Sequence, residues 1–97
     1  MNDFDKYQIN ARKTADYPKI GSGIVYPAIG IGGEAGEVLE QIKKVFRDDG
    51  GILTEERKQK IIKEMGDELW YLANLATELD VNFSHIAEEN LKKLWKC

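Results

Sequence analysis

The sequence is almost devoid of cysteine. Cys97, the last residue, is the only one, which excludes an internal disulfide and a CxxC metal site. Long apolar runs are lacking as well, since none approaches the 18 residues of a membrane-spanning helix. The polar start, MNDFDKYQIN, has no apolar segment of the kind that directs secretion. We therefore expect a cytoplasmic protein in a reducing setting, with no membrane as partner.

An excess of positive charge is the second absence. The 14 lysines and arginines are outnumbered by 17 aspartates and glutamates, which gives a formal net charge of −3. Proteins that bind a nucleic-acid backbone usually carry a basic patch, so we expect no nucleic-acid polymer as partner. A single nucleotide held through a metal cation is compatible with this charge.

Strand-forming segments are nearly missing, and helical periodicity fills most of the chain. Apolar residues recur at three- and four-residue spacing. This spacing predicts helices over about 4–16, 28–47 and 55–79, and a last helix from a cap at Asn82 to about 95. The fold class is therefore all-α, an antiparallel, bundle-like arrangement of four helices in one domain, 1–97. Such a small core is expected to gain from association into a homo-oligomer.

The apolar spacing also predicts which helix faces form the core. Residues that share one face at 100° per residue are expected to point inward. These are Ile31, Ala35, Val38, Leu39, Ile42, Val45 and Phe46 in the second helix, Ile61, Met65, Leu69, Leu72 and Ala76 in the third, and Ile86, Ala87, Asn90, Leu91 and Leu94 in the last.

Paired acidic residues stand beside these apolar stripes. The segment GEAGEVLEQIKK places Glu34 and Glu37 three residues apart, and EMGDELWYL places Glu64 and Asp67 at the same spacing. Like charges this close on a helix repel slightly, so their convergence from two antiparallel helices would call for a cation. All-oxygen ligands favour Mg²⁺ or Mn²⁺ over zinc. The alternative for either pair alone is a solvated, glutamate-rich helix face, which is common.

Aromatic and glycine residues flank the acidic pairs. Trp70, Tyr71 and Asn74 lie on or beside the acidic face of the third helix, opposite its predicted core stripe. A second buried contact is expected there, either a subunit interface or a ligand pocket. Flat rings and an amide suit a nucleobase, while packing of the aromatic rings remains an open alternative. Gly33 and Gly36 weaken a helix by about 1 kcal/mol each relative to Ala, which suggests the close approach of another backbone or a ligand.

These segments resemble the MazG-like nucleoside triphosphate pyrophosphohydrolases. The resemblance is carried by GEAGEVLEQIKK, the DDGG spacer and EMGDELWYLANLATEL, and it extends to YQINARKTADYP, GIVYPAIGIGGEAGE and IAEENLKKL, nearly the whole chain. Members of this all-α family carry an EExxE pattern, a spacer and then ExxD. The first Glu of EExxE falls on Gly33 here, a departure that leaves four carboxylates intact. The family's metal ligands carry over to Glu34, Glu37, Glu64 and Asp67.

The resemblance implies a Mg²⁺-dependent enzyme that hydrolyses a nucleoside triphosphate between its α and β phosphates. The products would be a nucleoside monophosphate and pyrophosphate. Glu34 or Glu37 would serve as general base, and the choice between them is open. The number of metal ions, the preferred base and sugar, and dimer against tetramer are open too. The residues expected to bind substrate are Lys44, Trp70, Tyr71, Asn74, Asn90 and Lys93.

Several of these substrate-binding residues have a plainer interpretation. Lys44 is spaced to pair with Glu40 on the same helix. Asn90 and Lys93 match a region that, in the family, often closes the pocket of a partner subunit, but they also fit a polar helix edge.

Two other functions are compatible with the sequence. The protein could be a non-catalytic helical oligomerisation module, or a regulatory protein that binds nucleotides without turnover. A di-iron carboxylate bundle is rejected, because it requires Glu-x-x-His motifs and the residue three before His85 is Asn82.

Overall fold

The computed structural model describes residues 2–95 and contains four helices and no strand in that range. The helices are α1 (Asp3–Lys13), α2 (Val25–Arg47), α3 (Glu55–Glu78) and α4 (Phe83–Trp95). The all-α prediction is therefore confirmed, while Cys97 lies outside the described residues. None of the four helices combines the length and the apolar character needed to cross a membrane.

The helix boundaries differ from the predicted ones at the end of α1, which stops at Lys13 rather than at about residue 16, and at the start of α2. Helix α2 begins at Val25 rather than at about residue 28. Pro27 lies in the first turn, where the N–H that proline lacks would have no helical partner. At the start of α1, Asn2 caps the helix, since its Oδ1 accepts a hydrogen bond from Asp5 N at 3.0 Å.

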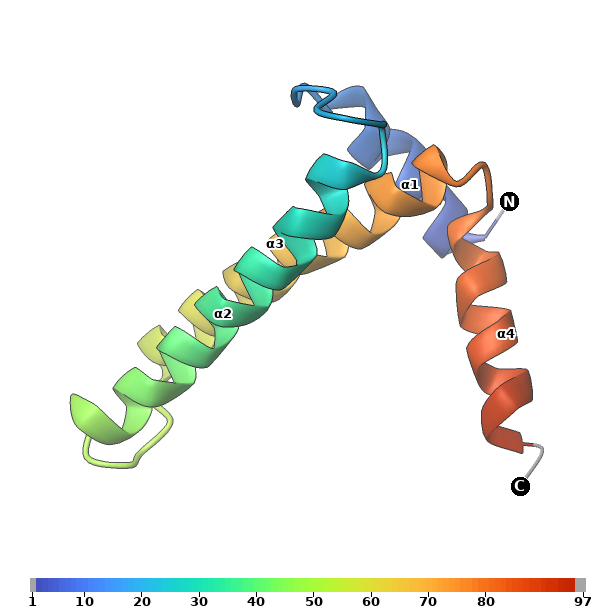
Figure 1. Cartoon of the computed structure of the whole chain (residues 1–97). Coiled ribbons are helices and arrows are strands. Elements are labelled where there is room, and N and C mark those ends of the chain that lie inside the picture. Colours follow the sequence, from blue (N-terminus) through green and yellow to red (C-terminus); the bar gives the residue numbers. More distant parts are fainter. Residues whose placement is uncertain (1, 96–97) are drawn as a thin grey trace.

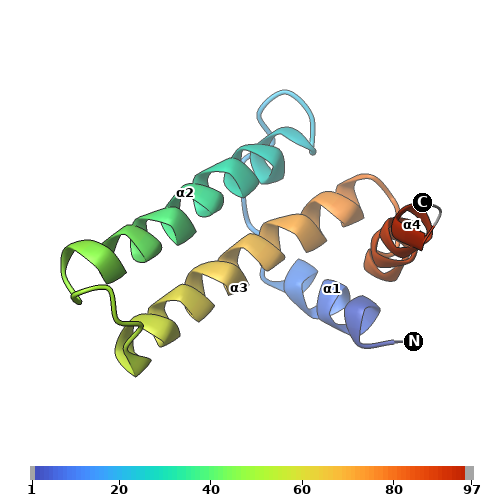
Figure 2. The ribbon, with the colours of Figure 1, turned by 90° about the horizontal axis from the view of Figure 1, so that it is seen from below.

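Helices α2 and α3 run antiparallel and side by side over most of their length (Figures 1 and 2). Gly50 and Gly51 adopt φ values of 66° and 79° in the turn between them, a conformation that glycine tolerates at low cost. Arg57 then ties the hairpin together, because its guanidinium donates to Asp49 and to Gln41 Oε1, each at 2.9 Å. This hairpin places the two acidic segments opposite one another.

Helix α1 packs across the C-terminal half of α3, on the side away from α2 (Figure 2). The buried apolar cluster there consists of Ala11, Ala73, Ala76 and Phe83. Polar contacts hold the following loop to α3, since Tyr17 and Arg12 both donate to Glu78 Oε2. The small core of the described chain therefore lies at this junction rather than along the hairpin.

Helix α4 projects away from the other three helices instead of closing a four-helix bundle (Figure 1). It contacts α1 and α3 but, within residues 2–95, not α2. Most of the residues expected to point inward from α4 are exposed, namely Ile86, Asn90, Leu91 and Leu94. The predicted bundle is thus wrong for α4 in a single chain, because its buried residues, Phe83 and Ser84, lie in its first turn.

The predicted core stripe of the hairpin is also wrong in part. Leu39, Phe46 and Met65 are 69%, 70% and 57% exposed, respectively. Four more residues of the predicted stripe are exposed as well, namely Ala35, Ile42, Leu69 and Leu72. The predicted residues that are covered along the α2–α3 contact are Ile31, Val38, Val45 and Ile61, and the covered residues that were not assigned to the core are Glu34, Gln41, Arg57, Glu64, Glu68 and Tyr71. Each helix carries two faces with apolar residues, and the chain covers the face that also carries the carboxylates.

Candidate metal centre

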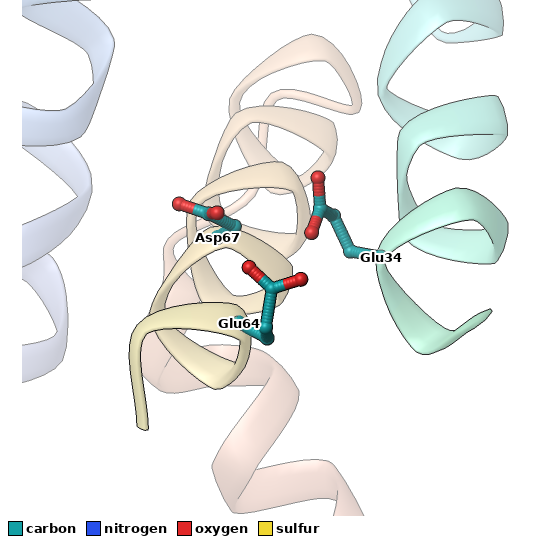
Figure 3. Close-up of side chains that lie close together, drawn as sticks. All are labelled: Glu34, Glu64 and Asp67. Atoms are coloured by element: carbon teal, nitrogen blue, oxygen red, sulfur yellow. The ribbon is translucent and has the colours of Figure 1, made fainter. Parts of the chain in front are cut away.

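Three of the four predicted carboxylates come together between α2 and α3 (Figure 3). Glu34 reaches across from α2, and Glu64 and Asp67 lie one turn apart on α3. One oxygen of each carboxylate lies within 4.8 Å of the others. Oxygens bound to the same Mg²⁺ are at most about 4.2 Å apart, twice the Mg–O distance, so a small side-chain movement suffices for a shared ion.

Burial and mutual repulsion both disfavour the charged carboxylates of this cluster. The pKa of Glu34 is raised by burial first and then by the charges of Asp67, Glu64, Glu37 and Glu68. Its Oε2 atom is buried and has no hydrogen-bond partner within the described chain. A divalent cation would relieve both the repulsion and the missing contact. The residues present therefore fit a hard, oxygen-seeking metal ion.

Glu37, the fourth predicted ligand, lies beside Glu64 but is not one of the three residues, Glu34, Glu64 and Asp67, whose oxygens lie within 4.8 Å of one another. Burial raises the pKa of Glu64, and the charge of Glu37 and a hydrogen bond with it add to this shift. Lys44 is close enough to lower the same pKa slightly. Glu40, its alternative partner, pairs instead with Lys43 at 3.2 Å. The structure thus brings Lys44 to the edge of the acidic cluster.

Tyr71 is the aromatic residue that borders the cluster. Its pKa is raised by burial, then by Tyr26, Glu34 and Asp67. Its ring also leaves no room for a side chain at Gly30, where an added Cβ would overlap the ring atoms. Trp70 packs against Tyr71 edge to face, with ring centroids 5.1 Å apart, but its Nε1 donates to Thr14 Oγ1 at 2.8 Å, so the Trp70 ring belongs to the α1 junction and Tyr71 alone borders the carboxylates.

Three of the predicted substrate-binding residues lie elsewhere. Asn74 is 1% exposed, and its amide group donates to Trp70 O and accepts from Arg12 Nη1. The structure therefore gives Asn74 a packing contact at the α1 junction. Asn90 and Lys93 are exposed on α4, away from the hairpin that holds the carboxylates. Within one chain they are not brought together with the acidic cluster.

Gly33 and Gly36, the glycines beside the first acidic pair, have no close neighbour in the described chain, unlike Gly30. A Cβ added at Gly33 or Gly36 would meet nothing within 4 Å. The backbone or ligand that was expected to approach Gly33 and Gly36 closely is therefore not supplied by the described part of this chain.

Two features of the site escaped the sequence analysis. Glu68 is a fifth acidic residue near Glu34, and its position one turn after Glu64 was the signal that it shares the inner face. Tyr26 lies between the rings of Tyr17 and Tyr71, with centroid distances of 5.5 and 6.4 Å. Tyr26 is in the first turn of α2 but precedes the predicted start of this helix at about residue 28, so periodicity gave no signal for the contact.

Comparison with known proteins agrees with this geometry. The family model of the MazG nucleotide pyrophosphohydrolase domain matches residues 29–96. A relative named Gene 37 protein, from Mycobacterium phage L5, is 43% identical over 95 residues, which span 93% of this chain and 83% of the relative. No solved structure matches the chain. The match covers α2, α3 and α4, including all the carboxylates described above, and the chain belongs to the MazG nucleotide pyrophosphohydrolase family.

Proposed function

We propose that the protein hydrolyses a nucleoside triphosphate, ribose or deoxyribose, to the nucleoside monophosphate and pyrophosphate, with Mg²⁺ or Mn²⁺ as cofactor. The observation that supports this most is the convergence of Glu34, Glu64 and Asp67 from two helices of a MazG-family domain. Mg²⁺ held there would bring the phosphates to an otherwise repellent acidic surface, neutralise charge on the leaving pyrophosphate and acidify a bound water.

All four carboxylates would serve as metal ligands. Glu64 and Asp67, on one turn of α3, would hold the ion from one side, and Glu34 and Glu37 would hold it from α2. Either Glu34 or Glu37 would also accept the proton of the water that attacks the α phosphorus. The bond between the α phosphorus and the bridging oxygen then breaks, and pyrophosphate leaves with that oxygen.

The residues that border the cluster suit the rest of a nucleotide. Lys44 lies near Glu64, and its ammonium group would contact a phosphate oxygen. Tyr71 lies beside the carboxylates, where a sugar or base could pack against its ring. Trp70, which packs against Tyr71 from the side of α1, would support that ring and could extend the stacking surface. Asn74 is excluded from such a role as long as it keeps its contacts with Trp70 and Arg12.

The proposal includes a homo-oligomer. Exposed apolar residues on α2 and α3 form a surface that a second copy would cover. The exposed helix α4 of that copy would then carry Asn90 and Lys93 toward the nucleotide, where the amide could contact base or sugar and the ammonium a phosphate.

The decisive assay measures pyrophosphate release from a panel of canonical and modified NTPs and dNTPs. We expect release with Mg²⁺ that stops on addition of EDTA and in Glu64→Gln. Glu56→Gln is the matched control, because it removes one exposed carboxylate from the same helix outside the cluster. No release across the panel would favour a non-catalytic oligomerisation module. Metal-dependent nucleotide binding without release would favour a regulatory protein.

A further inference from the structure

Glu68 lies in a place where a carboxylate is costly for the fold. It stands on α3 one turn after Glu64, on the face that α2 covers. Its Oε1 atom is buried and makes no hydrogen bond. An apolar side chain at this position would pack between the helices at no such cost, because burying a polar atom without a partner is unfavourable.

Glu34 shows the same defect from the opposite helix. Among residues 2–95, the buried side-chain oxygens without a partner are Glu34 Oε2 and Glu68 Oε1. Both belong to the α2–α3 contact, and Glu68 is one of the charges that raise the pKa of Glu34. Two unpaired carboxylate oxygens in one contact repel each other unless something positive lies between them.

We propose that Glu68 is a further metal ligand, which binds through Oε1 a divalent cation shared with Glu34 Oε2. The centre then extends from Asp67 at the exposed edge, past Glu64, into the α2–α3 contact. This inference rests on the proposed function only in taking the acidic cluster as a metal centre. It adds a residue outside the paired ExxE and ExxD spacing and explains why a carboxylate is tolerated between the helices.

The test compares the wild type with Glu68→Gln, which keeps the size and removes the charge. Mn²⁺ affinity is measured by titration calorimetry, and the melting temperature is measured without metal and at saturating Mn²⁺. Glu56→Gln is again the control for the loss of one charge from the same helix. Without metal, we expect Glu68→Gln to have a higher melting temperature than wild type. We expect its Mn²⁺ affinity to be lower by about ten-fold or more, and its melting temperature to rise less on addition of Mn²⁺.

Different failures identify different errors. If wild type binds Mn²⁺ and Glu68→Gln binds it within about two-fold, the role of Glu68 is wrong while the proposed function stands. If wild type binds no Mn²⁺, the metal centre and the proposed function both fail. Glu68→Met serves as a second variant. Loss of helical structure in both variants without metal would show that the fold itself needs the carboxylate, and would overturn the inference.

Discussion

Glutamates of two opposite kinds stand on the same helix, α3. Glu64 and Glu68 face other carboxylates, whereas Glu78 accepts hydrogen bonds on Oε2 from the Tyr17 hydroxyl and from Arg12. The pKa of Glu64 is raised, chiefly by burial, and the pKa of Glu78 is lowered, chiefly by the bond from Tyr17 and then by that from Arg12. At the scale of single residues, the charged form of a glutamate is therefore disfavoured at the candidate metal centre and favoured at the α1 junction.

Glu78→Gln should lower the free energy of unfolding at pH 7 by about 1 kcal/mol, the usual worth of such hydrogen bonds. Because the folded-state pKa of Glu78 lies below its ordinary value of 4.5, its stabilisation is fully present above that value. It is lost as the pH falls through the lower, folded-state pKa. Urea unfolding of both proteins at neutral and acid pH measures the difference.

The control for this experiment is Glu89→Gln, which removes an exposed carboxylate that pairs with Lys92 at 3.7 Å. Surface pairs of this kind contribute little, so the control should unfold like wild type at both pH values. A Glu78→Gln difference that stays the same size in acid would contradict the proposed origin of the stabilisation.

At the scale of elements, α4 depends on α1 for its orientation. Gln8 Oε1 accepts a hydrogen bond from Phe83 N at 2.8 Å, and its Nε2 donates to Thr77 and to Val81 O. Asp5 accepts from the backbone and hydroxyl of Ser84. Side chains of one helix thus satisfy amides that the first turn of another helix leaves free.

Gln8→Ala should loosen α4 while leaving the hairpin intact. The substitution leaves the buried Phe83 N–H without a partner, which costs about 1–3 kcal/mol. Hydrogen exchange should speed up in α4 and change little in α2. Asn10→Ala is the control, because Asn10 Nδ2 makes an exposed bond to Lys6 O within α1. Unchanged exchange in α4 would show that Gln8 does not position this helix.

The existence of the helices followed from periodicity, but the faces they bury did not. Val45 and Ile61 were assigned to the core and are covered, while Leu39 and Met65 were assigned to it and are exposed. Periodicity finds apolar faces without saying whether the same chain or another molecule covers them. The acidic cluster followed from two pairs of carboxylates, Glu34 with Glu37 and Glu64 with Asp67, because the members of each pair are one helical turn apart. Glu68 was missed because an acid on a covered face contradicts the rule that buried charges are rare.

At the scale of the whole molecule, the hairpin leaves one apolar side uncovered. Exposed residues recur at helical spacing on α2 and α3, namely Leu39, Ile42, Phe46, Ile62, Met65, Leu69 and Leu72. Viewed along each helix from its N-terminus, these residues are rotated about the helix axis by roughly a quarter to half a turn from the residues that face the other helix. The direction of this rotation is the same in α2 and α3. Because the helices are antiparallel, the two stripes lie on the same side of the hairpin. A surface of this kind is typical of an interface.

Leu39→Glu should therefore convert a homo-oligomer into a monomer. A charge placed within a buried interface is strongly unfavourable, whereas in the separated chain the same position is exposed. Light scattering during gel filtration gives the mass of each species, and circular dichroism checks that the helices remain. Ile29→Glu is the matched control, since Ile29 is 68% exposed on α2 but lies away from the stripe. A wild-type mass equal to that of one chain, or an oligomer that persists in Leu39→Glu, would show that this surface does not join copies of the protein. If the wild type is an oligomer and Leu39→Glu is a monomer, the melting temperature of the wild type should also rise with protein concentration, because association then contributes to the stability of the fold.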